Sequence, residues 1–190
     1  VALDGVWIRK ALRYGLYVTG PAVDVEDSLI QETRLAASGK DGWGVWLAAG
    51  AKGAFRRTAI EASHTVALRV GEKGTTAKLE DVVVRGTQQA ADFTFGRGIQ
   101  VTQGATLEGA RVLAENNRET GIYESGAGTQ ATLTDVTVRG TETDLSTGNF
   151  GVGMYVRDHA SAVVTRGTFD DNRAQGVLVS GADSGLTVSD

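Results

Sequence analysis

The sequence predicts an all-β solenoid, a single-stranded parallel β-helix of about seven to eight coils. Three observations predict this fold class: a repeat of about 54 residues, two similar halves in each repeat, and 26 glycines with one proline. A fixed repeat of this length is typical of solenoids, because each unit buries its apolar face only against its neighbours. Val, Ala, Thr and Leu dominate the remainder, which favours β-structure with many turns.

Two motifs carry the repeat. Val84 to Thr87 (VRGT) returns as Val138 to Thr141, 54 positions later. Gly42 to Val45 returns as Gly96 to Ile99 after another 54 positions, and as Gly151 to Met154 after 55. We therefore expect one domain over residues 1–190, with two-coil repeats at about 23–76, 77–130 and 131–183.

Each repeat contains two kinds of strand motif. The first is glycine followed by apolar–any–apolar, as in Gly153 to Val156, and the second is small–any–apolar–any–any–apolar–any–apolar, as in Ala131 to Val138. Copies of the second motif begin at residues 1, 23, 53, 77, 105, 131, 162 and 184, so a coil averages about 26 residues. Alternation with period 2 indicates strands, and no segment is long and periodic enough for a crossover helix. Coils stacked about 4.8 Å apart would give a rod of roughly 35 Å. A β-propeller fits less well, because it needs four antiparallel strands per unit.

Residues Gly121 to Gly140, GIYESGAGTQATLTDVTVRG, resemble the repeat of right-handed parallel β-helix proteins of the pectate-lyase-like superfamily. More narrowly, they resemble the right-handed β-helix repeat segments of predicted bacterial surface and secreted proteins. The resemblance covers essentially the whole chain. It implies a right-handed solenoid and an extracellular, cell-surface or periplasmic location, but no particular activity, because a fold does not fix a function.

Composition excludes several classes of function. The net charge is −4 and no Lys/Arg cluster occurs, so we expect no nucleic-acid partner. There is no cysteine, which excludes a disulfide framework and a thiolate site, and no apolar run approaches the ~20 residues of a membrane span. Because both ends break inside a coil, we expect the natural protein to continue at one or both ends, or another chain to cover the exposed strand edges.

The first candidate site is a column of aromatic side chains. In the strand motif that begins with glycine, the residue between the two apolar positions is expected to point to solvent. Read coil by coil, this residue is Tyr17, Trp46, Arg69, Gln100, Tyr123, Tyr155 and Leu178. Four of the seven are aromatic in a chain with 6% aromatics, which is typical of a binding surface for a glycan or an extended peptide. The alternative is that aromatics are simply good strand residues that shield the sheet.

The second candidate site is a set of three long loops, one on every second coil. They run from Gln31 to Trp43, from Arg85 to Arg97 and from Arg139 to Val152. Solenoids usually carry insertions on one face, which is often the binding face. Each loop ends near an aromatic residue, and these residues are Trp43, Phe93 with Phe95, and Phe150. The alternative is that these rings fold back as small satellite cores.

Catalysis has little support in the sequence. Enzymes of the pectate-lyase-like superfamily use clustered Asp with Ca²⁺ and an Arg base, or Asp pairs with Gly-His-Gly and Arg-x-Lys motifs, and none of these motifs is present. Asp170 and Asp171 are the tempting pair for acid–base work, but Asp is ordinary in a corner turn. His64 aligns with Asn116 and Asn172 at a corner, where polar residues form buried ladders, and His159 falls in a turn. Neither histidine has a metal-ligand partner at the usual spacing, so we expect no metal site and no cofactor.

The sequence therefore favours a non-catalytic β-helical scaffold and binding module of a secreted or cell-surface bacterial protein. Its ligand would be a glycan or a protein, bound through Tyr17, Trp46, Tyr123 and Tyr155 and through Trp43, Phe95 and Phe150 of the loops. One alternative is a fragment of a polysaccharide lyase or glycoside hydrolase. Another is a purely structural filament or shell segment, with end-to-end or lateral self-contacts.

Overall fold

The computed structural model describes residues 1–190, and all of its regular elements are β-strands. One sheet has 11 strands: β1 (Ala2–Asp4), β2 (Trp7–Arg9), β4 (Ala22–Glu26), β5 (Leu29–Gln31), β7 (Lys52–Arg56), β8 (Ala59–Glu61), β10 (Thr76–Arg85), β12 (Thr106–Glu115), β14 (Gln130–Arg139), β16 (Ser161–Asp170) and β18 (Gly185–Ser189). The other has seven: β3 (Tyr14–Thr19), β6 (Trp43–Ala48), β9 (Val66–Gly71), β11 (Arg97–Thr102), β13 (Thr120–Ser125), β15 (Val152–Arg157) and β17 (Gln175–Ser180). The chain contains no helix long and apolar enough to cross a membrane.

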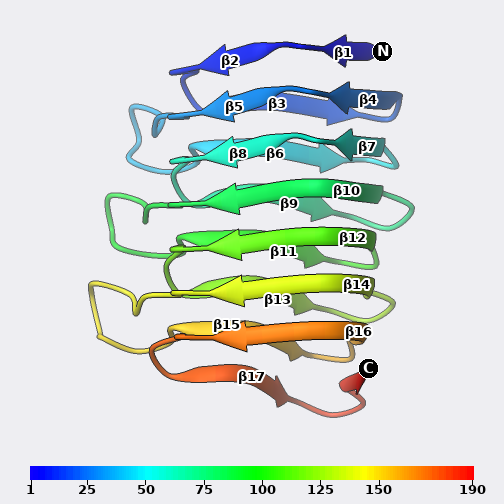
Figure 1. Ribbon diagram of the computed structural model, residues 1–190. Helices are drawn as coiled ribbons and strands as arrows, with labels where there is room; N and C mark the ends of the chain where they lie inside the picture. The colour runs from blue at the N-terminus through cyan, green and yellow to red at the C-terminus, as the bar shows by residue number, and fades with distance from the viewer.

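All strand pairs in both sheets are parallel, and along the main path of each sheet the strands follow one another in sequence order. The larger sheet runs β1-β4-β7-β10-β12-β14-β16-β18, with β2, β5 and β8 continuing beside it to the second half of β10. The smaller sheet runs from β3 to β17. Figure 1 shows the chain passing from one sheet to the other and back while it advances along one axis. This arrangement fits the parallel β-helix that the sequence predicts. The eight strands that open the rows of the larger sheet begin within one residue of the predicted positions, as at Ala22, Thr76 and Gly185. The copy predicted at residue 105 is nevertheless out of register by two residues, because Leu107 rather than Ala105 pairs with Ala131.

A bend divides each row of the larger sheet into two halves. The residue at the bend has a left-handed backbone, with φ between 45° and 55°, at Asp27, Arg57, Asp81, Arg111, Asp135 and Arg166. This explains the two consecutive unspecified positions in the strand motif. Thr134 and Asp135 both point away from the core, and the alternation then resumes with Val136 and Val138 buried inside.

The core lies between the two sheets and is almost entirely aliphatic. It contains 32 buried hydrophobic residues. In the smaller sheet, one inward column consists of Val45, Leu68, Ile99, Ile122 and Met154, which follow one another in register. All five are fully buried, and burying a side chain of this size contributes about 1.5–3 kcal/mol.

Asparagine side chains close the corner between the sheets. The Asn117 Oδ1 accepts hydrogen bonds from Thr87 N (3.1 Å) and Thr87 Oγ1 (2.7 Å), and its Nδ2 donates to the Val84 carbonyl (3.2 Å). Asn172 makes the same kind of contacts one repeat later. Polar residues therefore line this corner as predicted, but the predicted register was wrong by one residue at two coils. Ser63 and Asn117, rather than His64 and Asn116, occupy the position of Asn172.

Glycine is required where the chain enters the smaller sheet. A Cβ on Gly98 would lie 2.6 Å from the carbonyl oxygen of Gly121 and 2.7 Å from Nδ2 of Asn117. Such separations are well inside van der Waals contact. The glycine of the motif thus lets one coil approach the next, and it fixes the point at which each long loop rejoins the stack.

Candidate functional site

The aromatic column of the smaller sheet has the register that the sequence predicts. Tyr17 pairs with Trp46, Gln100 pairs with Tyr123, and Tyr123 pairs with Tyr155. Arg69 continues the same line between Trp46 and Gln100. Residues up to 138 positions apart in sequence therefore lie in one line on the outer face of the smaller sheet.

Most of this column is covered, which differs from the expectation of an exposed stripe. Tyr17 is 47% exposed, but Tyr155 is only 8% exposed, and Trp46 and Tyr123 are half-buried. The Tyr155 hydroxyl also hydrogen-bonds to Ser180 Oγ at 2.9 Å. The expectation of exposure is therefore wrong for Tyr155, and packing between neighbours occupies much of the column.

Two clusters account for the covering. At one end, Trp46 stacks on Tyr17 with ring centroids 4.5 Å apart and meets Trp43 edge-on at 4.5 Å. The Arg69 guanidinium lies 4.4 Å from the Trp43 ring centroid, and its burial lowers the pKa of Arg69. Trp43 is itself buried, so this loop aromatic folds back onto the stack as a satellite core.

The second cluster surrounds Arg97, a residue that the sequence reading did not single out. Its guanidinium lies 3.7 Å from the ring centroid of Tyr123 and 4.8 Å from that of Phe95. It also pairs with Glu119, with Nη2 and Oε1 2.5 Å apart. Both partners are largely shielded from water, which strengthens such a pair. Arg97 therefore joins the column to the second long loop.

The three long loops touch one another across the coils that separate them. Ala91 N donates to the Gly39 carbonyl (3.0 Å), which joins the first loop to the second. Leu145 N donates to Gln89 Oε1 (2.8 Å), which joins the second loop to the third. Figure 1 shows the loops projecting from the same edge of the stack, where we call them the long-loop edge (residues 32–42, 86–96 and 140–151).

Three phenylalanines are exposed on this edge. Phe93 is 50%, Phe95 37% and Phe150 43% exposed, so these rings do not form a satellite core as Trp43 does. They line an open hollow of about 230 Å³ whose floor includes Arg97 and Glu119. This volume is below the roughly 300–1,000 Å³ of typical small-molecule sites, so the hollow suits one side chain or one sugar ring of a larger partner.

Asp144 orders the third loop from within. Its carboxylate accepts hydrogen bonds from the backbone and hydroxyl groups of Ser146 and Thr147, at 2.6–3.0 Å, and from Asn149 N at 3.1 Å. Burial would raise the pKa of this carboxyl, but the hydrogen bonds outweigh it and hold the pKa at about 2. Phe150 therefore follows a turn whose conformation is held by hydrogen bonds within the loop.

The residues considered for catalysis or metal binding lie away from the long-loop hollow. Asp170 ends β16 and Asp171 follows it in a left-handed corner, and both are exposed with no side-chain hydrogen bond or ion pair. His64 Nδ1 lies 3.0 Å from the Thr33 carbonyl oxygen, and His159 Nδ1 lies 3.4 Å from Asp183. The structure brings none of these four side chains to the long-loop hollow.

The sequence reading also missed a buried acid. Glu124 occupies the inward end of the glycine motif, between Val101 and Val156 in register, and it is fully buried. Neither carboxyl oxygen has a hydrogen-bond partner. Burial raises its pKa to about 8. Its position in the motif, where other coils have valine or leucine, was the available signal.

Two columns of alternating charge run along the outer face of the larger sheet. We call the first the bend column (Asp27, Arg57, Asp81, Arg111, Asp135, Arg166) and the second the strand-end column (Gln31, Glu61, Arg85, Glu115, Arg139, Asp170). In the bend column, Arg111 Nε lies 2.6 Å from Asp81 Oδ1, and this hydrogen bond lowers the pKa of Asp81. In the register of the structure, the fifth position of the strand motif alternates between Asp and Arg. The copy predicted to begin at residue 105 hid this signal, because its true counterpart of Ala131 is Leu107, and counting from 105 places Gly109 rather than Arg111 at the fifth position.

Comparison with known proteins gives no match for this chain among family models, curated proteins or solved structures.

Proposed function

We propose that this chain is a non-catalytic scaffold of the right-handed, pectate-lyase-like β-helix type, with about seven to eight coils, that presents the long-loop edge to a partner outside the cytoplasm. The observation that carries this proposal is the group of exposed rings, Phe93, Phe95 and Phe150, around one hollow. Exposed aromatic residues gathered on ordered loops are characteristic of binding surfaces. The stacked strands provide rigidity, and the loops provide the contact.

A protein partner is favoured over a glycan by the make-up of the hollow. Its aromatic rings are three phenylalanines, which have no hydroxyl or indole group to hydrogen-bond a sugar. The hydroxyls of Thr94, Ser146 and Thr147, which also line it, already donate to Asp92 or Asp144. Its buried floor is an ion pair between Arg97 and Glu119. An aromatic rim around a water-shielded charge pair resembles the centre of a protein interface, where aromatic and Arg residues carry most of the binding energy.

The test is a comparison of the unchanged protein with the triple variant Phe93→Ala/Phe95→Ala/Phe150→Ala. Both are immobilised and exposed to a glycan array and, separately, to a surface-protein extract of the source cells. Val163→Ala, which removes an exposed apolar side chain from β16, is the matched control. Retention of a protein by the unchanged chain and the control, but not by the triple variant, supports the proposal. Glycan binding that the triple variant loses would keep the surface and change the ligand class.

The enzymatic alternative has a separate test. Turnover of an acidic polysaccharide that disappears on changing Asp170→Asn and Asp171→Asn would contradict the non-catalytic proposal. The purely structural alternative is favoured by one specific observation, the alternating charge on the larger sheet.

A further inference from the structure

The outer face of the larger sheet, beyond the bend, has a regular composition. Each row presents three outward residues: the bend residue, a middle residue two positions later, and the strand-end residue two positions after that. The rows are Asp27-Leu29-Gln31, Arg57-Ala59-Glu61, Asp81-Val83-Arg85, Arg111-Leu113-Glu115, Asp135-Thr137-Arg139 and Arg166-Thr168-Asp170. We call this surface the charged face.

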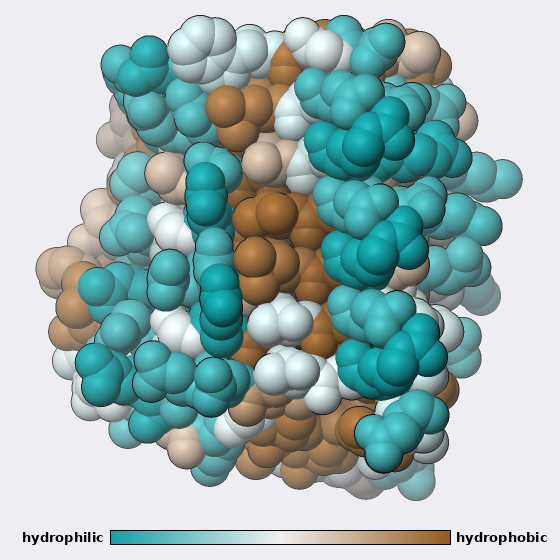
Figure 2. Space-filling model, viewed as in Figure 1, coloured by the Kyte–Doolittle hydropathy of each residue, from teal (hydrophilic) through white to brown (hydrophobic).

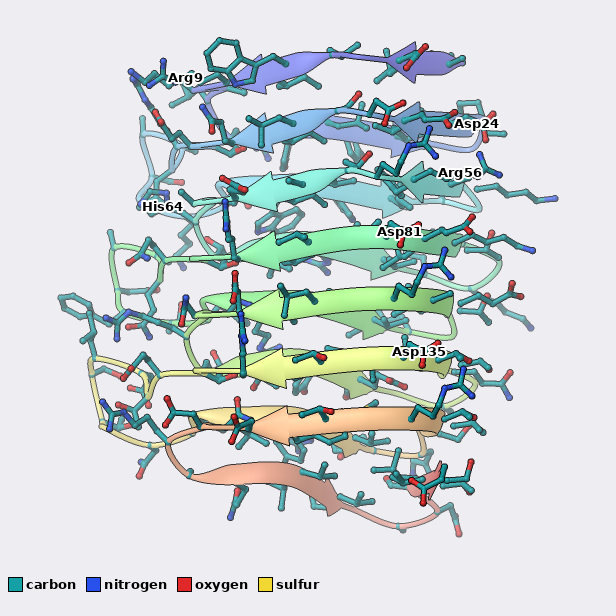
Figure 3. All side chains as sticks on the ribbon, viewed as in Figure 1. Arg9, Asp24, Arg56, His64, Asp81 and Asp135 are labelled. Atoms are coloured by element: carbon teal, nitrogen blue, oxygen red, sulfur yellow. The ribbon has the colours of Figure 1, made fainter.

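An uncharged stripe lies between the two charged columns. Figure 2 shows it as an apolar band bordered on both sides by hydrophilic residues, and Figure 3 places Asp81 and Asp135 on one border. The stripe is Leu29, Ala59, Val83 and Leu113, continued by two threonines. A hollow of about 420 Å³ lies over Leu29, Ala59 and Val83, because the flanking side chains are longer.

The informative feature is which charge each column carries in a given row. Charge alternates along both columns except at the neutral Gln31. The alternation pairs opposite charges in neighbouring rows of one chain, as in Asp81–Arg111 (2.6 Å) and Glu61–Arg85 (2.7 Å). In five of the six rows the two borders also carry opposite charges. The borders of one row lie about 13 Å apart, beyond the Debye length of ~8 Å, so this opposition contributes little within one chain.

The opposition matters when a second copy faces the first. A two-fold axis parallel to the stack and lying along the stripe places each bend residue opposite the strand-end residue of the same row in the other copy. Arg57 would then meet the carboxylate of Glu61, and Asp81 would meet the guanidinium of Arg85. The stripe meets itself, so that leucine faces leucine and threonine faces threonine.

We propose that the charged face is a self-association surface on which a second copy of this chain binds in parallel around that two-fold axis. The five arginines of the face can extend to the second copy, because each exposes about half of its side chain (49–55%). A two-fold antiparallel pairing also matches charges but places Leu29 against Thr168 and Ala59 against Thr137, so the stripe favours the parallel pair. Six rows bury roughly 400–600 Å² per copy, at the low end for specific interfaces, so the pair is expected to be weak.

Single cysteines test the proposal, because the chain has none of its own. Ala59→Cys and Thr137→Cys lie on the proposed axis three rows apart, and each would meet its own copy. Thr132→Cys, on the outer face before the bend, is the control. Under mild oxidation we expect covalent dimers at least tenfold faster for the two axis variants than for the control, with the rate falling as salt rises from about 0.05 to 0.5 M.

Two outcomes would overturn the proposal. Equal rates for all three variants would show that the charged face has no preferred contact. Failure of Ala59→Cys and Thr137→Cys to cross-link, when Val83→Cys mixed with Leu113→Cys forms the heterodimer, would show the antiparallel pair instead. Circular dichroism of each variant checks that it folds. Loss of this pairing would leave the long-loop proposal intact, because the two surfaces share no residue.

Discussion

The buried carboxyl group of Glu124 makes stability depend on pH in a direction that can be calculated. Its pKa is about 8 in the folded chain, against 4.5 for an unperturbed glutamate, because burial disfavours the charged form. Below pH 4.5 the group is protonated in both states and has no effect on the pH dependence. Between pH 4.5 and 8 only the unfolded chain ionises, so the free energy of unfolding falls by about 1.4 kcal/mol per pH unit.

The substitution Glu124→Val isolates this effect, since Val101 and Val156 are its neighbours in register. A shift from 4.5 to about 8 corresponds to about 3 kcal/mol at pH 7 and about 5 kcal/mol above pH 8. The variant should therefore be more stable than the unchanged protein by an amount that grows by about this much from pH 4 upward. Removing two unpaired carboxyl oxygens should add a pH-independent gain of about 1–3 kcal/mol.

Urea unfolding at pH 4, 6 and 8, followed by circular dichroism, measures the difference between the two proteins, and the other titrating groups cancel in it. Glu108→Val, at an exposed position of β12, is the control and should show no comparable growth with pH. A stability difference for Glu124→Val that stays constant between pH 4 and 8 would refute the reasoning. It would mean that the Glu124 carboxylate reaches water or a cation.

Three further predictions concern the corner and the loops. Asn117→Ala should lower the free energy of unfolding by about 2–4 kcal/mol in urea titrations, because it leaves the buried amide of Thr87 without its acceptor; a loss under 1 kcal/mol would contradict this. Gly98→Ala should be strongly destabilising in the same assay, whereas Gly71→Ala, whose Cβ would meet nothing closer than 3.6 Å, should change stability by less than about 0.5 kcal/mol. Asp144→Ala should speed proteolytic cleavage within residues 140–151. Because the folded pKa of Asp144 is depressed to about 2, protection of the unchanged loop should persist at pH 4 and disappear between pH 3.8 and 2; loss of protection already at pH 5 would exclude this role.

The strand positions and the alignment of the aromatic column could be predicted because both follow from local periodicity. Once Gly44 and Gly98 mark where coils enter the smaller sheet, the register of Trp46 with its neighbours is fixed. Burial of the column could not be predicted in the same way. It depends on contacts from a second column three residues earlier, where Trp43 and Arg97 lie across the rings.

The long-loop edge was located by sequence but its organisation was not. Loop length identified the three segments, whereas the contact between Gln89 and Leu145 joins residues 56 positions apart and has no local signal. Exposure of Phe95 and Phe150 likewise depends on how each loop turns. The alternation of Asp and Arg at the bends was only partly visible in the sequence. Arg57, Asp81 and Asp135 occupy the same place in their predicted motif copies, but Arg111 does so only when the copy predicted at residue 105 is moved by two residues, as the strand pairing requires.

The most direct measurement for the long-loop edge is the dissociation constant of the partner retained in the screen described above. It should be compared between the unchanged protein, the variant Phe93→Ala/Phe95→Ala/Phe150→Ala, and Tyr17→Ala, which alters the exposed end of the aromatic column. Three aromatic truncations at about 1 kcal/mol or more each should weaken binding about 100-fold, while Tyr17→Ala changes it less than about twofold. Binding that survives the triple substitution, or that is lost with Tyr17→Ala, would contradict the assignment of the long-loop edge.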